Sequence, residues 1–484
     1  MREDGGTPAE RAVNRLWAPR AWIDGRWQQA VLLEVDGAGH WASITPGVGA
    51  PPDHATKLPG PVLPGLVDAH SHAFQRAFAG LAERPAIGSD SNDDFWSWRD
   101  RMYGVALRIT AEQLRAVAAQ LYVELLGGGY TQMCEFHYLF HAPDGRPYDD
   151  PCTLAWALAD AAEQAGCGLT ILPTLYQRAG FTANTLRTDQ RRFAGTPASV
   201  LSMQRAIRGA RRPRVDAGVA IHSLRAAPPA SIDELLKALD GEPLPIHVHV
   251  AEQQREVDDC LAATGARPIE WLCRPRRLDA RWQLVHATHA KPSEIDAVAA
   301  SGAGVVLCPS TEANLGDGLP DLPRWLTAGV PLGIGSDSQV GRSAMEELRW
   351  LEYGQRLIHR RRNIAASLAT PASAARLFDA VLSGGARSAG LARWGLIAGA
   401  RADALVIDSN APGILGTPPD HTLDALVFAT DAPAFRDVWV AGRRVVAGGR
   451  HVHASAIAER FERAMDQLWM GAPHSTAHHV DPPR

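Results

Sequence analysis

Short apolar runs alternate with longer amphipathic stretches through the middle of the chain. The stretches between the runs are rich in alanine and leucine at helical spacing. This alternation predicts parallel βα units, and eight of them over roughly 280 residues predict an α/β fold of the (β/α)8 barrel type. The eight runs are Val62–Val67, Tyr130–Phe136, Leu169–Leu175, Val215–Ile221, Pro245–Val250, Trp282–Val285, Ala303–Leu307 and Pro331–Ile334. A doubly wound open sheet is the alternative, but no G-x-G-x-x-G segment follows the first run.

The two ends of the chain have a different pattern. Residues 15–60 and 400–450 alternate as short strands joined by turns. The turn signals are Asp24-Gly25, Asp36-Gly37 and Ala441-Gly442. A helical pattern follows at 454–470, and the residues after it are typical of a loose tail. Both ends are therefore expected to be rich in β-structure and to lie outside the barrel.

Composition excludes several classes of protein. The chain has 484 residues, of which 46% are hydrophobic and 21% charged, so it can bury a large core. A formal net charge of −4 gives no basic field for nucleic acid or an anionic membrane. No run of 18 apolar residues predicts a membrane span, and the N-terminus has no apolar stretch typical of a secretory signal. Six cysteines without a C-x-x-C pair are typical of a reducing compartment, so we expect a cytoplasmic protein.

Metal-binding and polar residues follow most of the predicted strands. In chain order they are His70 and His72, then Glu135, His137 and Tyr138, then His222 and Arg225, then His247, His249 and Glu252, then His286, and finally Asp337. The carboxyl ends of barrel strands converge on one face, where active sites are built. Burying so many polar groups without partners would be costly, so the pattern indicates a site. Imidazole and carboxylate ligands suit zinc or iron(II).

Four of these motifs together resemble the amidohydrolase superfamily. They are Gly65–His72, His249-x-x-Glu252, His286 and Ser336-Asp337-Ser338. The resemblance covers nearly the whole chain and matches the deaminase branch with one metal. It implies a barrel over residues 61–394 and a small β-sandwich domain built from residues 1–60 and 395–450. A terminal helix and loose tail would occupy residues 451–484.

The resemblance also implies a role for each residue at the strand ends. The ligands of one divalent metal ion, most simply Zn²⁺ with Fe²⁺ as the alternative, would be His70, His72, His249 and Asp337. Glu252 would be the general acid/base, His286 would lie beside the reactive water, and Asp337 would also accept a proton. His247 shares a strand face with His249 and competes for the ligand role, but the H-x-x-E spacing favours His249. Relatives with two metals bridge them with a lysine on the fourth strand, and Val215–Ser223 contains none.

Longer motifs narrow the resemblance to one branch of the superfamily. They lie at residues 70–76, 95–99, 135–138, 222–225, 247–253 and 308–318. This branch hydrolyses N-formimino-L-glutamate to N-formyl-L-glutamate and ammonia in histidine degradation. The resemblance therefore implies a small dicarboxylate substrate, and we expect a homodimer.

The residue types at these positions suit such a substrate. Arginine binds carboxylates through two parallel charge-assisted hydrogen bonds, so Arg99 and Arg225 are the candidates for the two carboxylates. Tyr138 and His222 would add hydrogen bonds, and Gln75 would contact the formimino end. We expect the tryptophans at 96 and 98 to pack within a lid formed by residues 88–104.

Three alternatives stay open at this point. The chain resembles, less closely, deaminases of guanine or adenosine derivatives in the same superfamily. A barrel that lost its activity and serves as a scaffold is a second alternative, although all the expected ligands are present. Release of formamide and glutamate is the third, because both routes start from the same tetrahedral adduct.

Overall fold

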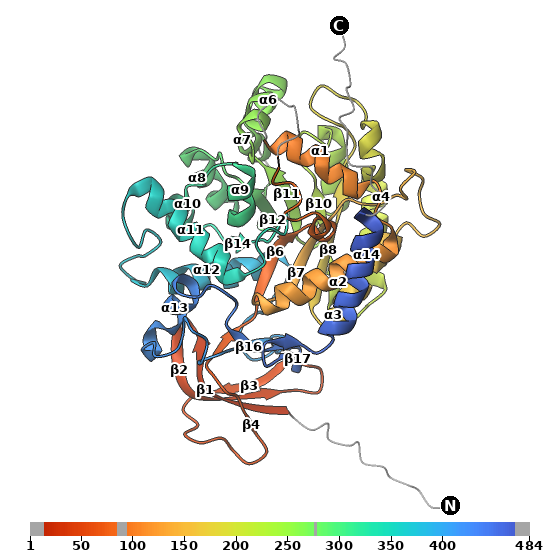
Figure 1. Ribbon diagram of the computed structural model, residues 1–484. Coiled ribbons are helices and arrows are strands. Elements are labelled where there is room, and N and C mark those ends of the chain that lie inside the picture. The colour runs from red at the N-terminus through yellow and green to blue at the C-terminus, as the bar shows by residue number, and fades with distance from the viewer. Residues whose placement is uncertain (1–13, 85–93, 275–277, 470–484) are drawn as a thin grey trace, which may run out of the picture. The chain divides into compact units, whose positions relative to one another are not determined.

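The computed structural model describes residues 14–84, 94–274 and 278–469, in two compact units (Figure 1). One unit contains the chain up to Gly65 together with Arg393–Arg450, and the other contains Leu66–Ala392 and the chain from His451 onward. The tail expected at 470–484 and residues 88–93 of the expected lid lie outside the described residues.

The larger unit is built around a closed ring of parallel strands. In chain order they are β6 (Leu66–Ser71), β7 (Tyr130–His137), β8 (Gly168–Leu175), β9 (Val215–Ala217), β10 (Val219–Ile221), β11 (Ile246–Val250), β12 (Trp282–His286), β13 (Gly304–Leu307) and β14 (Leu332–Ile334). The ring closes because β14 pairs with β6, and β10 pairs with both β8 and β11. This closure confirms the predicted barrel and excludes the open sheet.

Two of the eight predicted runs are each divided into two strands. The run Val62–Val67 was expected to be one barrel strand, but Val62–Pro64 forms β5 in the sheet of the smaller unit. The proline and glycine at 64–65 end that strand, since proline has no N–H for a sheet ladder. The fourth run is interrupted at Gly218, where a Cβ atom would lie 2.5 Å from the carbonyl oxygen of Pro245. Only glycine therefore allows this strand to approach its neighbour so closely.

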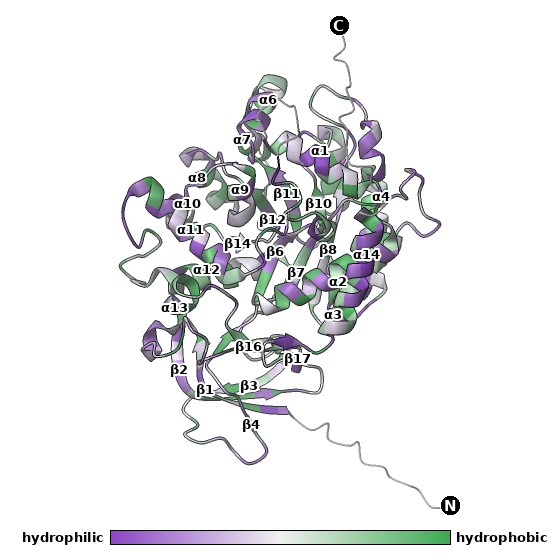
Figure 2. Cartoon of the chain, viewed as in Figure 1, coloured by the Kyte–Doolittle hydropathy of each residue, from purple (hydrophilic) through white to green (hydrophobic). Residues whose placement is uncertain are grey.

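Helices follow the strands and cover the ring. They are α1 (Phe95–Ala106), α2 (Ala111–Gly127), α3 (Thr153–Ala165), α4 (Pro197–Gly209), α5 (Pro229–Ala238), α6 (Gln254–Thr264), α7 (Pro268–Leu272), α8 (Pro292–Ser301), α9 (Pro309–Leu315), α10 (Leu322–Thr327), α11 (Ala344–His359), α12 (Ser373–Ser388) and α14 (Ala454–Trp469), with short 3-10 turns η1 (Ala73–Ala77) and η2 (Thr188–Phe193). Helices such as α2 and α14 carry both hydrophilic and hydrophobic colours in Figure 2, as expected of amphipathic helices on a barrel. In the described part of the chain, no helix has the length and apolarity to cross a membrane.

The smaller unit is one continuous sheet made from both ends of the chain. Its strands are β1 (Asn14–Ile23), β2 (Arg26–Val35), β3 (Trp41–Thr45), β4 (Thr56–Lys57), β5, β15 (Ala404–Ile407), β16 (Phe435–Val440), β17 (Arg443–Ala447) and β18 (Arg450–His451), with η3 (Pro419–His421) and α13 (Thr422–Phe428) between β15 and β16. The predicted turn at Asp24-Gly25 joins β1 to β2, and both of its residues have positive φ, as tight hairpin turns require. A buried core that includes Leu16, Leu33 and Val406 holds this sheet together.

Candidate functional site

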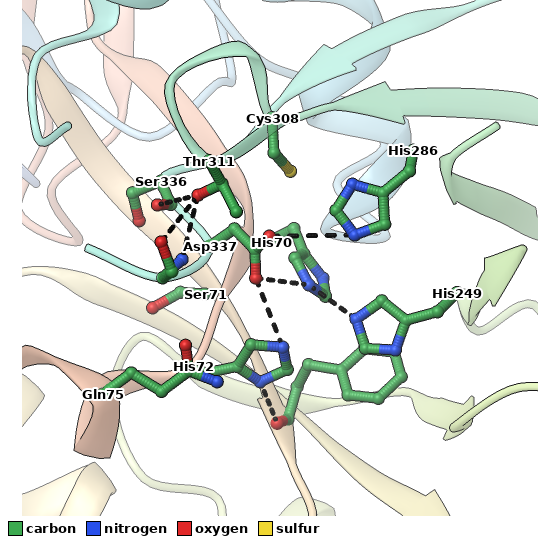
Figure 3. A network of polar contacts seen from close by, with 12 residues as sticks. His70, Ser71, His72, Gln75, His249, His286, Cys308, Thr311, Ser336 and Asp337 are labelled. Atoms are coloured by element: carbon green, nitrogen blue, oxygen red, sulfur yellow. Dashed lines mark hydrogen bonds and ion pairs between the residues drawn. The ribbon is translucent and has the colours of Figure 1, made fainter. Parts of the chain in front are cut away.

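Four predicted ligands converge at the carboxyl ends of three barrel strands. His70 lies in β6 with His72 directly after it, His249 lies in β11, and Asp337 follows β14. One ligand atom from each of these four residues lies within 4.8 Å of those of the other three (Figure 3). The Nε2 atoms of His70 and His249 are 3.0 Å apart, and Asp337 Oδ1 lies 3.3 Å from His70 Nε2.

The hydrogen bonds of His72 and His249 show that their Nε2 atoms face the cluster as acceptors. His72 Nδ1 bonds the carbonyl oxygen of Phe136 at 3.1 Å, and His249 Nδ1 bonds that of His222 at 3.0 Å. A carbonyl oxygen only accepts, so each Nδ1 carries the proton and each Nε2 presents a lone pair. His72 Nε2, which carries this lone pair, is 3.4 Å from Asp337 Oδ1. Acceptors placed this close repel unless a cation lies between them, so this donor set fits a divalent metal ion.

Protonation in the cluster also favours a cation. Burial lowers the pKa of His72 to about 3 and the pKa of His249 well below its ordinary value. Burial lowers the pKa of His70 as well, although Asp337 opposes the shift. Burial would raise the pKa of Asp337, but the hydrogen bond from His70 and the nearby imidazoles lower it. The residues are therefore in the deprotonated forms that bind metals.

His286 and Glu252 lie beside this cluster. His286 Nε2 is 3.7 Å from both Glu252 Oε1 and Asp337 Oδ2, and its Nδ1 is 3.3 Å from Glu312 Oε1. Burial raises the pKa of Glu252 to about 7, although the charge of His286 opposes the shift. Burial would lower the pKa of His286, but the three carboxylates raise it to about 10. An acid/base group near neutrality thus lies next to a protonated imidazole.

The backbone at three strand ends adopts a conformation that side chains rarely take. Ala251, His286 and Asp337 have φ of 51°, 69° and 48°. Left-handed non-glycine residues cost energy and cluster at functional sites, where the surrounding structure holds them. The Glu256 carboxylate holds the first of these turns, because it accepts the N–H groups of Ala251 and Glu252 at 3.2 Å.

Three other strand-end residues that the sequence singled out do not belong to the cluster. Glu135 accepts hydrogen bonds from Ser71 Oγ and from the N–H of residue 73, so it supports the segment that carries the ligands. His247 Nε2 donates to the carbonyl oxygen of Ser388 at 2.8 Å. His137 is buried beside the ring of Phe140.

All five predicted substrate-binding residues line one pocket, together with His72, His249 and Asp337 of the ligand cluster. The pocket has a volume of about 540 Å³, including space open to solvent. Its polar lining includes His72, Gln75, Arg99, Tyr138, His222, Arg225, His249, Glu252, His286 and Asp337. Arg225 is 8% exposed. Its Nη1 and the Nε of Arg99 are buried and have no hydrogen-bond partner among the described residues. Two guanidinium groups with unsatisfied donors therefore lie near the cluster.

The structure adds residues that sequence reasoning missed. Trp98, expected to pack only within a lid, also lines the pocket, and so do Tyr103, Tyr176 and Phe193. One face of α1 lines the pocket, through residues 95, 98, 99, 102 and 103. Their helical spacing is the feature of the sequence from which this pocket wall could have been predicted. Glu312 lies in the motif at residues 308–318, and no spacing in the sequence links it to His286.

Comparison with known proteins agrees with this geometry. The model of the Amidohydrolase family matches residues 62–445. The chain is 45% identical over 457 residues to the formimidoylglutamate deiminase of Pseudomonas aeruginosa, covering 94% of this chain and 100% of that protein. It is 27% identical over 409 residues to a 5-methylthioadenosine/S-adenosylhomocysteine deaminase of Natronomonas pharaonis, covering 84% and 86% of the two chains.

Two solved structures share the fold. The crystal structure of an amidohydrolase from Brucella melitensis matches with a TM-score of 0.87 and 41% identity, over 94% of this chain and 99% of that one. An adenosine deaminase from Xanthomonas campestris with bound zinc matches with a TM-score of 0.78 and 22% identity, over 96% and 100%. Family, sequence and architecture agree, and the chain belongs to the amidohydrolase family.

Proposed function

We propose that this amidohydrolase hydrolyses N-formimino-L-glutamate to N-formyl-L-glutamate and ammonia. The observation that carries the proposal is the pair Arg99 and Arg225, each of which has a buried N–H donor without a partner among the described residues, in the pocket that also contains residues of the ligand cluster. Two such arginines suit a substrate with two carboxylates, since each carboxylate satisfies one planar guanidinium. The similarity to a formimidoylglutamate deiminase over its whole length supports the same substrate.

Amidohydrolases use a metal ion, and we infer one Zn²⁺ per chain, held by His70, His72, His249 and Asp337. Three imidazoles and one carboxylate are a donor set that zinc accepts while keeping a position open. Cys308 lies near Asp337 and His286, and burial raises the pKa of its thiol well above the ordinary value. No lysine lies on β9 or β10 to bridge a second ion. Metal analysis of the purified protein would test the number and identity of the ion.

Residues around the cluster would move the protons of the reaction. A bound divalent metal lowers the pKa of a coordinated water toward about 7. Water adds to the formimino carbon and gives up one proton to Asp337, while His286 donates a hydrogen bond to the oxygen that becomes negative. Glu252 delivers one proton to the terminal nitrogen and the proton held by Asp337 supplies the second, so the bond from carbon to that nitrogen breaks and ammonia leaves. The hydroxyl of the adduct gives its proton back to Glu252 as the formyl carbonyl forms. A Glu252 pKa of about 7 suits this exchange, because the group both gains and loses a proton near neutral pH.

The remaining pocket residues would orient the substrate. Gln75 Nε2 donates to the hydroxyl of Tyr138 at 3.2 Å, and Gln75 Oε1 is buried without a partner among the described residues. That oxygen is available for an N–H of the formimino group. The hydroxyl of Tyr138 and the ring of His222 lie on the same wall and would bond the carboxylates. We further infer a cytoplasmic enzyme whose partners are small molecules, with no role for nucleic acid.

The proposal is tested by product analysis with purified, zinc-replete protein. N-formimino-L-glutamate should yield ammonia and N-formyl-L-glutamate, and Glu252→Gln should lower kcat by about 10²–10⁴-fold. Formamide with glutamate would overturn the assignment of the leaving group. No turnover of this substrate, together with release of ammonia from guanine or 5-methylthioadenosine, would overturn the substrate in favour of a nucleobase or nucleoside.

An exposed apolar face supports the expectation of a homodimer. Trp350, Tyr353 and Leu357 of α11 are 40%, 37% and 76% exposed, and their spacing places them on one side of the helix. Contiguous exposed apolar side chains of this kind mark association surfaces. Light scattering on the eluting protein should give twice the chain mass, and Leu357→Glu should give a single chain. A monomeric wild-type protein would contradict the expectation.

A further inference from the structure

A second pocket lies on the outer side of the two carboxylate-binding arginines. It has a volume of about 1,090 Å³, including space open to solvent, and shares Arg99 and Arg225 with the pocket that contains residues of the ligand cluster. None of the four cluster residues lines it. The rest of its wall comes from α1, from the loop after β8 and from α6, through Trp96, 179–182, Arg255, Asp259 and residues 262–263. A molecule in this pocket therefore contacts the inner arginines without contacting the cluster.

Three guanidinium groups surround one ring in this pocket. The Cζ atoms of Arg99, Arg225 and Arg255 lie 4.6, 5.2 and 4.9 Å from the centre of the Trp96 ring. The aromatic face attracts each cation, which lets three like charges gather there. Acidic compensation is partial. Among the described residues, the ion pairs of Arg255 and Arg99 are long, at 3.9 Å to Asp259 and 3.8 Å to Asp100. The buried carboxylates of Glu252 and Glu256 interact with Arg225 from the inner side. The pocket thus carries excess positive charge.

We propose that the outer pocket is an anion-binding antechamber in which Arg255, beside Trp96, first binds a carboxylate of the substrate. Arg99 and Arg225 line both pockets. A dicarboxylate in the outer pocket therefore loses its contact with Arg255 and gains contacts with Arg99 and Arg225 as it moves inward. Arg255 is 68% exposed, which leaves it accessible to a solute, whereas the inner pair is largely buried. The inference rests on the proposed function, because it assumes that the substrate of the inner pocket is a dicarboxylate.

Charge at the entrance of a site affects how readily the substrate binds, and so KM, and does not affect the rate of the chemical step. An anion is concentrated by a cationic pocket, and added salt removes the effect. Arg255→Gln should therefore raise KM about three- to fivefold at low ionic strength and leave kcat unchanged. Arg255→Lys keeps the charge and should restore KM. Asp259→Asn removes the opposing charge and should lower KM.

The matched control is Arg205→Gln, which removes an exposed arginine of the same unit that lines neither pocket. The differences between wild type and Arg255→Gln should vanish near 1 M salt, where charges are screened within about 3 Å. Equal KM values for Arg255→Gln and Arg205→Gln would overturn the antechamber. A loss of kcat that Arg255→Lys does not restore would also overturn it, because it would indicate a structural role.

A binding measurement separates this inference from the proposed reaction. Glutarate has two carboxylates and no formimino group, and its binding can be followed by tryptophan fluorescence without turnover. Weaker glutarate binding by Arg255→Gln, in a protein that fails to hydrolyse N-formimino-L-glutamate, would support the antechamber and reject the reaction. Normal hydrolysis with glutarate binding independent of Arg255 would reject the antechamber alone.

Discussion

His286 is held by carboxylates on both of its ring nitrogens. Glu252 and Asp337 face Nε2, and Glu312 lies 3.3 Å from Nδ1 while also accepting the N–H of Cys308 at 2.9 Å. Glu312 touches no pocket space, since it is not among the pocket's lining residues and is 2% exposed. It therefore acts through His286, fixing the ring and keeping its Nδ1 protonated, as a carboxylate behind a histidine does in many sites.

We expect Glu312→Gln to lower kcat about 10- to 100-fold with little change in KM. The neutral amide stabilises the charged imidazole less than a carboxylate does, so the pKa of His286, raised to about 10 with Glu312 in place, should fall. The alkaline limb of the kcat profile should move to lower pH, and Glu312→Asp should partly restore it. Glu352→Gln removes another fully buried carboxylate of the same unit and is the control for a purely structural loss. An unmoved alkaline limb in Glu312→Gln would contradict this role.

Glu347 of α11 gives a prediction about pH and stability. It is fully buried, accepts hydrogen bonds from the N–H and Oγ of Ser310, and burial raises its pKa to about 8 despite those bonds. Between an unfolded pKa near 4.5 and the folded value, the folded protein binds more protons than the unfolded chain, so stability falls as pH rises through that window. The contribution is complete below pH 4.5 and is lost above about pH 8.

Glu347→Gln mimics the protonated acid and should flatten this dependence. From pH 5 to 8.5 the variant should lose less stability than wild type, by on the order of a few kcal/mol, seen as a smaller fall in Tm. Glu234→Gln, at an exposed position of α5, should keep the wild-type profile. Parallel pH profiles for Glu347→Gln and wild type would show that Glu347 is ionised in the folded protein.

Some site residues could be predicted from the sequence because they form pairs at short spacing along the chain. His70 and His72 alternate at the end of β6, and His249 in β11 is followed by Glu252 three residues later. The partners of these residues could not be predicted in the same way. Glu312 reaches His286 only because β12 and β13 are neighbours, and Tyr176 reaches the pocket from a loop whose course is set by tertiary packing.

At the scale of elements, the strands were predictable and their breaks were not. Apolar runs mark burial on both faces of a parallel strand, so seven of the eight runs overlap the barrel strands closely. The run Val62–Val67 contributes to two different sheets. Its division could not be predicted, because hydrophobicity shows that a residue is buried but not in which of two cores it is buried. Gly218 interrupts the fourth strand through contact with Pro245, which is distant in sequence.

Helix α12 lies so close to β14 that it requires a glycine. A Cβ atom on Gly384 would lie 2.1 Å from the carbonyl oxygen of Leu332, and one on Gly385 would lie 2.9 Å from Cβ of Val67. Gly384→Ala should therefore force helix and strand apart and lower the stability by about 3 kcal/mol, measured as a reduced Tm. Gly209→Ala, in α4 with no atom within 4 Å of the added Cβ, should be neutral or slightly stabilising. Equal Tm values for the two variants would contradict the close approach.

At the scale of the whole barrel, the ring is weakest where its first and last strands meet. β14 and β6 share one paired position, Ile334 with Asp68, whereas β7 and β8 share six. Hydrogen bonds from Ser336 to the Asp68 carboxylate and an isolated bridge between residues 71 and 337 add further links. The proposed metal ligands come from β6, from the segment after β14 and from β11 across the ring, so a bound ion would join the two sides of this seam.

Removal of the metal should therefore destabilise the seam first. A chelator should lower Tm by roughly 5–10 °C, since a ligand bound only by the folded state stabilises it by mass action. Hydrogen exchange should accelerate in β6 and β14 more than in β7 and β8, because local opening follows the sparsest pairing. In His72→Ala the chelator should change Tm little, since that protein binds metal weakly from the start. Uniform acceleration across all strands would mean that the ion stabilises the fold as a whole and that ladder pairing alone holds the seam.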